Sequence, residues 1–100
     1  MPTYISLMSM TDQGVKRVHE APGNIKKAVE AMEAAGGRLL GFYVTMGDYD
    51  FVAITECPDD ETSMALAMAL GSIGDVRTNT MRAFTSEQMA GLLQKTEKLY

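Results

Sequence analysis

The chain has 100 residues, of which 46% are apolar and 22% charged, and its net charge is −4. This length and composition are typical of one globular domain, 1–100, and exclude a largely disordered chain. The nine basic residues are scattered and form no stripe. Because nucleic-acid binders neutralise phosphates with basic patches, we expect no nucleic-acid partner.

The sequence also bears on location. Cys57 is the single cysteine and cannot close an intramolecular disulfide, and its acidic neighbours would suppress the thiolate. The N-terminal segment lacks the basic and apolar regions of a signal peptide. The longest apolar run, Met64–Leu70, is shorter than the ~20 residues that span a bilayer. We therefore expect a cytoplasmic protein with no membrane partner.

Alternation of side chains predicts a first strand over Thr3–Met10. Thr11-Asp12 then predicts a helix start. We interpret Pro22-Gly23 as a break between a short helical turn and a main helix that Asn24 caps. Gly36-Gly37 is expected to end this helix.

The middle of the chain predicts a hairpin. Strands are expected over Arg38–Met46 and Asp50–Cys57, joined by a turn at Gly47-Asp48-Tyr49. Strict alternation along the second strand puts one set of side chains on one face, Leu40, Phe42, Val44 and Met46, and another set on the opposite face, Leu39 and Tyr43.

In the last part of the chain, Pro58-Asp59 is expected to open an apolar helix that ends at Gly71 and Gly74. Val76–Phe84 predicts a fourth strand. Thr85–Gln88 fits a capping box at the start of a C-terminal helix.

The resulting order, β-α-β-β-α-β-α, predicts an α+β fold of the ferredoxin-like kind. Its antiparallel four-stranded sheet has the order 4-1-3-2, and the C-terminal helix is an addition. The first two helices would cover one face of the sheet. Strands two and three are apolar on both faces, so we expect a second copy to cover the other face and form a dimeric α/β barrel.

Three segments carry a resemblance to a known family. Met46–Ala53, with Pro2–Ile5 and Val76–Thr80 in the same order, resembles the GYD-domain family, named after its Gly-x-Tyr-Asp segment. The likeness covers roughly residues 2–92 and leaves Gln94–Tyr100 outside. It implies a ferredoxin-like dimeric barrel but no particular reaction.

The hairpin loop is one candidate ligand-binding segment. Asp48 and Asp50 bracket the phenol of Tyr49, and such groups can bind a cation or accept hydrogen bonds from a ligand. Turn chemistry alone also explains this pattern, because Gly47 and Asp48 are typical turn residues. No cofactor and no metal site are expected from the sequence.

The fourth strand is the other candidate. Thr78, Thr80 and Arg82 are expected on one face, with Arg77 on the other, and an arginine among hydroxyl groups could clamp a carboxylate or phosphate. The alternative is an edge strand with solvated arginines. His19 falls between helical segments and is interpreted as a surface residue.

Two functions from different classes remain open. The first is a non-enzymatic oligomeric module that binds or senses a small molecule, which fits the lack of a catalytic constellation. The second is a cofactor-independent enzyme, monooxygenase- or isomerase-like, in which Tyr49, Asp50 and Arg77 or Arg82 orient an acidic or aromatic substrate. An RNA binder on the same fold is disfavoured, because a basic stripe is missing. A perturbed titratable group facing a cavity would favour the enzyme.

Overall fold

The computed structural model describes residues 1–99 and contains one four-stranded antiparallel sheet in the order β2-β3-β1-β4. The predicted order of elements and strands is confirmed. In chain order the elements are β1 (Thr3–Met10), α1 (Asp12–Lys16), the 3₁₀ turn η1 (Val18–Glu20), α2 (Ala21–Ala34), β2 (Arg38–Val44), β3 (Phe51–Glu56), α3 (Asp60–Ile73), β4 (Val76–Ala83) and α4 (Ser86–Glu97).

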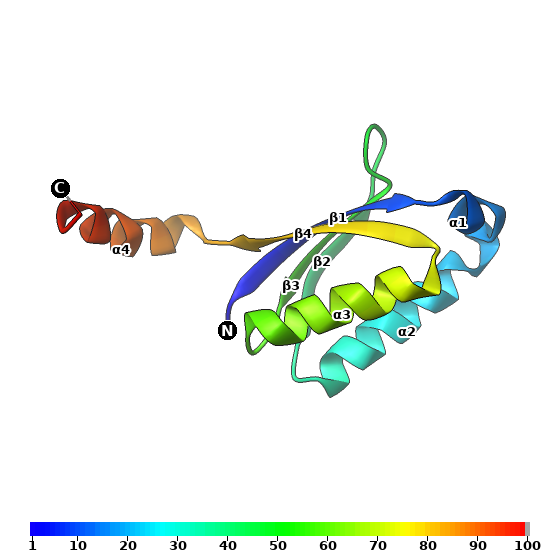
Figure 1. The fold of residues 1–100 in the computed structure, drawn as a ribbon, viewed down its shortest axis with the longest axis horizontal. Helices are drawn as coiled ribbons and strands as arrows, with labels where there is room; N and C mark the ends of the chain where they lie inside the picture. The colour runs from blue at the N-terminus through cyan, green and yellow to red at the C-terminus, as the bar shows by residue number, and fades with distance from the viewer. Residues whose placement is uncertain (100) are drawn as a thin grey trace.

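Helices α2 and α3 lie together on one face of the sheet, and no helix of residues 1–99 covers the other face (Figure 1). The fold is therefore the ferredoxin-like α+β arrangement. Helix α4, in orange and red, continues away from the end of β4 and stands apart from both layers (Figure 1). None of the helices in residues 1–99 is long and apolar enough to cross a lipid bilayer.

Three helix starts lie where the sequence predicts them, because each has a side-chain cap. Thr11 accepts a hydrogen bond from Gly14 N, and Asp59 accepts one from Thr62 N. Thr85 and Gln88 form the reciprocal capping box of α4. Such caps satisfy backbone N–H groups that have no partner inside the helix.

The predicted break at Pro22-Gly23 is wrong. Both residues lie in the first turn of α2, which starts at Ala21, and the irregular segment is η1 before it. Proline is tolerated in a first helical turn, because that turn has no N–H partner to lose. Asn24 is not the cap, and its amide Nδ2 instead donates to Asp75 at 3.4 Å.

Strict alternation along β2 is also wrong. The pairing with β3 shifts between Leu39 and Gly41, as in a β-bulge, so Leu39 and Phe42 lie on the same face. One extra residue in a strand reverses which face its later side chains occupy. The strands also end slightly earlier than predicted, with 45–50 in the connecting loop and Cys57 beyond β3.

The core between the sheet and the helices consists of two clusters. One contains the buried Tyr4, Met32 and Cys57, and the other contains Met8, Phe51 and Ala53. These side chains come from β1, β3, α2 and the segment after β3. Residues of both clusters also line the cavity that forms the candidate site.

Candidate functional site

A cavity of about 320 Å³ lies between the sheet and helices α2 and α3. Its walls are mainly apolar, with large side chains from both layers, among them Met8, Met10, Met32, Phe42, Phe51, Leu66 and Leu70. Binding sites for small molecules in proteins are commonly clefts of roughly 300–1,000 Å³ with walls of this kind. The cavity is therefore large enough for a small organic molecule.

The floor of the cavity carries a short row of hydroxyl groups. Ser6 on β1 lies directly opposite Thr80 on β4, and their side-chain oxygens are 2.8 Å apart. Thr78, two residues before Thr80, also lines the cavity. Two hydroxyl groups in contact leave spare donor and acceptor capacity for a ligand.

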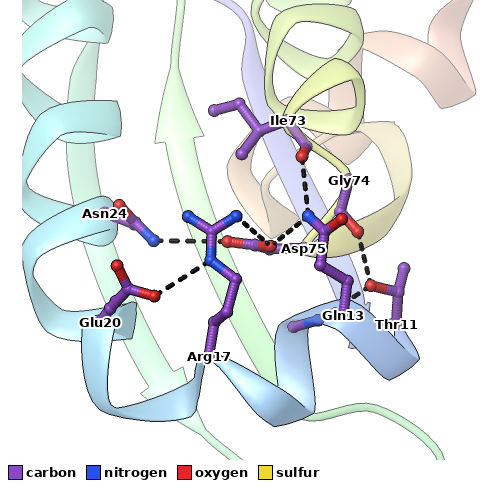
Figure 2. A network of polar contacts seen from close by, with 9 residues as sticks. Thr11, Gln13, Arg17, Glu20, Asn24, Ile73, Gly74 and Asp75 are labelled. Carbon is purple, nitrogen blue, oxygen red and sulfur yellow. Dashed lines mark hydrogen bonds and ion pairs between the residues drawn. The ribbon is translucent and has the colours of Figure 1, made fainter.

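Asp75, which follows α3, lines the cavity, and its carboxylate lies at the centre of a network of polar contacts (Figure 2). Asp75 accepts hydrogen bonds from Gln13 at 2.8 Å and Asn24 at 3.4 Å, and its carboxylate lies 3.5 Å from the Arg17 guanidinium. The hydrogen bond to Glu20, followed by the charge of Asp75, raises the pKa of Arg17. This network joins the start of α2 to the end of α3.

Cys57 also lines the cavity, and Tyr4 packs in the same core cluster. The Tyr4 hydroxyl donates to Asp60 Oδ1 at 2.5 Å and so ties β1 to the first turn of α3. Burial, together with this hydrogen bond, raises the pKa of Tyr4 to about 12. Burial also raises the pKa of the Cys57 thiol, and the charge of Asp59 raises it further. Both side chains are therefore neutral at physiological pH.

The hairpin loop is tied to β1. Asp50 Oδ2 accepts a hydrogen bond of 2.7 Å from Met10 N, and Asp50 N donates to Met8 O at 2.8 Å. Thr45 Oγ1 donates to the Tyr49 carbonyl at 2.5 Å, and Gly47 has a φ of 103°. Asp48 is exposed and Tyr49 half-buried. The Asp50 side chain and backbone thus continue the hydrogen bonding between β1 and β3 into the loop.

The predicted residues of β4 divide between the two faces of the sheet, as alternation predicts. Thr78, Thr80 and Arg82 pair with the helix-side residues of β1, whereas Arg77 pairs with Ser9 on the open side. Arg82 lies over the ring of Phe84, 4.5 Å from its centroid. Thr78 and Thr80 line the cavity together, while the loop residues Asp48, Tyr49 and Asp50 form a separate group.

Sequence reasoning misses most of the cavity lining. It interprets Asn24 as a cap, and it does not single out Asp75. One signal is present in β1, where the small polar Ser6 stands between Tyr4 and Met8 on the apolar face. A hydroxyl there indicates a polar partner or an unfilled space beneath the helices.

Among residues 1–99 there is no group of three or more His, Cys, Asp or Glu side chains arranged to hold a metal ion. The cavity's ionisable side chains, including Arg17, Lys27, Cys57 and Asp75, lie around its apolar walls. For two of them the pKa is shifted upward, so Cys57 stays a thiol and Arg17 a cation near neutral pH. The arrangement can enclose an apolar molecule and offer it hydroxyl hydrogen bonds.

The fold and the cavity define the class as a small ferredoxin-like α+β domain with an open sheet face. The chain belongs to the GYD domain family, whose model matches residues 4–93. It is 36% identical over 84 residues to the "Glutamine synthetase and cystathionine beta-lyase binding protein" of Thermus thermophilus. That match covers 83% of this chain and 88% of the relative.

Solved structures share the fold. TTHA0845 from Thermus thermophilus has a TM-score of 0.55 at 23% identity, with 86% of this chain and 96% of that chain covered. The feast or famine regulatory protein of M. tuberculosis, solved with L-methionine, has a TM-score of 0.64 at 13% identity. That match covers 86% of this chain, which spans about half (52%) of the regulatory protein.

Proposed function

We propose that the chain is a non-enzymatic binding module that holds a small, mainly apolar molecule between its sheet and helices. The observation that carries this proposal is the cavity of about 320 Å³ with its large apolar walls. Burial of apolar ligand surface would supply the binding free energy, at about 25 cal/mol per Å². The hydroxyl groups of Ser6 and Thr80 would orient one polar group of the ligand.

The chemistry around the cavity supports binding over catalysis. A general acid or base works best with a pKa near the operating pH. Around this cavity the resolved pKa shifts run the other way, because both the Cys57 thiol and the Arg17 guanidinium hold their protons more tightly. The cofactor-independent enzyme is therefore the less supported alternative.

The ligand contacts predicted from the sequence fall into two groups, one that lines the cavity and one that lies outside it. Thr78 and Thr80 belong to the proposed ligand site as lining residues. Arg77, Arg82, Asp48 and Tyr49 stay predicted contacts for a polar ligand outside the cavity. Asp50 has the weaker claim, since its carboxylate already accepts the hydrogen bond of Met10 N.

We also propose that the module is a homodimer formed through the open face of the sheet. The register puts large apolar side chains there: Ile5 and Leu7 from β1, Tyr43 from β2, Val52 and Ile54 from β3, and Met81 from β4. Tyr43 is 58% exposed and Met81 40% exposed in the single chain. An apolar antiparallel sheet face is normally covered, and a second copy covers it with the same surface.

A second candidate function is binding to another protein. The relative from Thermus thermophilus is named for binding two enzymes, and it is 36% identical to this chain. Met64 and Met68, 61% and 65% exposed on α3, would offer such a partner an apolar surface. Sedimentation of the purified chain with purified glutamine synthetase tests this candidate, and independent sedimentation of the two proteins would contradict it.

The proposal includes neither nucleic acid nor membrane as a partner, and it assigns the module to the cytoplasm. The net charge of −4 supports the first point, because binding to phosphates needs a local excess of positive charge. A mobility shift with single-stranded nucleic acid at low salt would contradict it.

The cavity is tested with 1-anilinonaphthalene-8-sulfonate, an anionic probe whose aromatic rings fluoresce more strongly in apolar surroundings. Ala28 of α2 lines the cavity, so Ala28→Leu fills part of it. Ala65→Leu on the exposed side of α3 adds the same carbons elsewhere and is the matched control. We expect Ala28→Leu to weaken probe binding at least tenfold and Ala65→Leu to leave it unchanged. Equal probe binding by all three proteins would contradict the ligand site.

A further inference from the structure

The C-terminal helix α4 is a formed helix that packs against neither the sheet nor the other helices in residues 1–99 to any extent that buries its side chains. Its capping box, made by Thr85 and Gln88, fixes its start, yet every residue from Phe84 to Leu99 is exposed. Figure 1 shows the helix beyond the end of the sheet, away from α2 and α3. An isolated 12-residue helix is marginal in water, so α4 needs contacts with another surface.

One side of α4 is apolar. Met89, Leu92 and Leu93 follow at i, i+3 and i+4, which places them on the same face of the helix. They are 55%, 40% and 54% exposed. Gln94 lies on the other side, about 100° from Leu93 by helical geometry. The three side chains define the α4 stripe, and an apolar stripe of this kind normally faces a protein surface.

The single chain exposes more surface than a compact domain of its size. Its accessible surface is 7110 Å² at a mass of 10.9 kDa. A compact monomer of this mass exposes about 5,600 Å². The radius of gyration, 15.4 Å, likewise exceeds the ~13 Å expected for 100 residues. The chain therefore exposes about 1,500 Å² more than a compact monomer does.

This excess is more than one ordinary interface would cover. A standard protein–protein interface removes about 800 Å² from each partner, whereas obligate dimers bury considerably more. Part of the excess comes from α4, whose residues are all exposed, and the α4 stripe is an apolar surface that continues from the end of β4.

Continuity along the chain favours a second copy as the partner of α4. Met81 and Ala83 lie on the open face, opposite Ile5 and Thr3, and α4 begins only three residues after Ala83. Any second copy that covers Met81 and Ala83 lies within a helical turn or two of Met89. The two-fold symmetry of such a dimer would repeat the contact, so each chain would both donate and receive a helix.

We propose that α4 is an arm that packs its Met89–Leu92–Leu93 stripe onto the second copy of this chain and so completes the dimer interface. The inference rests on the proposed sheet-face dimer, and it adds a contact that the sheet alone does not supply. Other proteins as partners of the stripe are an outcome of the test below.

The chain contains no tryptophan, so a single introduced indole reports on α4 without background. We expect Leu93→Trp to have blue-shifted emission in the wild-type dimer, because the stripe is covered there. In the Leu7→Asp background, which disrupts the sheet face, the emission should shift to that of solvent-exposed indole. Gln94→Trp is the matched control and should report an exposed indole in both backgrounds.

Each outcome has one meaning when light scattering is recorded on the same samples. If Leu93→Trp is a dimer with an exposed indole, the proposal that α4 is an arm is wrong, whereas the sheet-face dimer stands. The remaining partner for the stripe is then another protein. A blue-shifted indole that persists in the monomer means that α4 folds back on its own chain, which also overturns the arm. A monomeric wild type overturns the dimer and the arm together. As a second variant, Leu92→Asp should weaken dimerisation at least tenfold without unfolding the domain, and unchanged dimerisation would contradict the arm.

Discussion

Replacing Leu7 by aspartate is expected to split the proposed dimer into folded monomers. Leu7 lies on β1 in the middle of the open face, directly opposite Val52 on β3 and Asn79 on β4. It is half-buried in the single chain, so dimer formation would complete its burial. The substitution leaves the helix-side core untouched, because Leu7 points to the opposite face of the sheet.

The size of the effect follows from burial and symmetry. Full burial of a leucine stabilises by about 1.5–3 kcal/mol, and dimer formation would cover only the remaining exposed part of Leu7, at most about a third, which contributes up to about 0.5–1 kcal/mol per chain. A two-fold interface contains the residue twice, and the lost burial alone amounts to up to about 1–2 kcal/mol, or roughly 5- to 30-fold in Kd. An unpaired buried carboxylate costs several kcal/mol more. We therefore expect dimerisation to weaken by roughly a thousandfold or more.

The assay is light scattering at low micromolar concentration, with circular dichroism as the check on folding. Wild type should have at least twice the 10.9 kDa chain mass, and Leu7→Asp should have the mass of one chain. Val15→Asp is the control, because Val15 is 55% exposed on α1, away from the open face. A folded Leu7→Asp variant that keeps the wild-type mass would refute the reasoning.

Three further predictions concern the single domain. Ala28→Leu fills part of the cavity with three added carbons, so it should stabilise the chain by up to about 2 kcal/mol in thermal unfolding. A loss of stability would mean that side chains of the protein already fill this space. Tyr4→Phe removes the hydrogen bond to Asp60 and should cost about 1 kcal/mol near neutral pH. The pKa of Tyr4 is about 12 in the folded chain and 10.0 in the unfolded chain. The contribution of the Tyr4 hydroxyl to the stability of the fold should therefore be complete below pH 10 and decline between pH 10 and 12. A stability difference between wild type and Tyr4→Phe that stays constant up to pH 12 would contradict this. Asp50→Ala should lower the free energy of unfolding in denaturant by about 1–3 kcal/mol, because Met10 N loses its hydrogen-bond acceptor. Asp50→Asn keeps an acceptor oxygen and should cost less. Equal losses for the two variants would argue against this contact.

Local signals predict most of the fold. Alternation in Thr3–Met10 indicates the first strand, and polar residues before apolar runs locate the helix starts at Thr11, Asp59 and Thr85. These signals act within a few residues, so they can be recognised without knowing the rest of the structure. The alternation along β4 likewise assigns Thr78 and Thr80 to the helix side of the sheet.

The errors arise where distant segments decide the local structure. The bulge between Leu39 and Gly41 exists only relative to β3, so alternation within β2 alone could not indicate it. Asn24 has the chemistry of a cap, but its amide donates to Asp75, which is 51 residues away. In each case a contact across the fold overrides the local preference.

The candidate site was predictable only in part for the same reason. Thr78 and Thr80 could be assigned to one face of a strand, but the cavity above them depends on how far α2 and α3 lie from the sheet. The Gly47–Asp50 segment stands out in the sequence as a motif. In the structure the Asp50 carboxylate accepts a hydrogen bond from the β1 backbone. The sequence alone cannot distinguish a carboxylate with this structural role from one that binds a ligand.

Methionine methyl NMR with indole as the probe tests the ligand-binding function most directly. Of the nine methionines, Met8, Met10 and Met32 line the cavity. The exposed methionines Met46, Met64, Met68, Met81 and Met89 lie on other surfaces and are internal controls. The proposed function predicts saturable shifts of the three cavity methyl signals and little change in the others. Shifts confined to the exposed methionines, or no shifts at millimolar indole, would contradict a ligand site between the sheet and the helices.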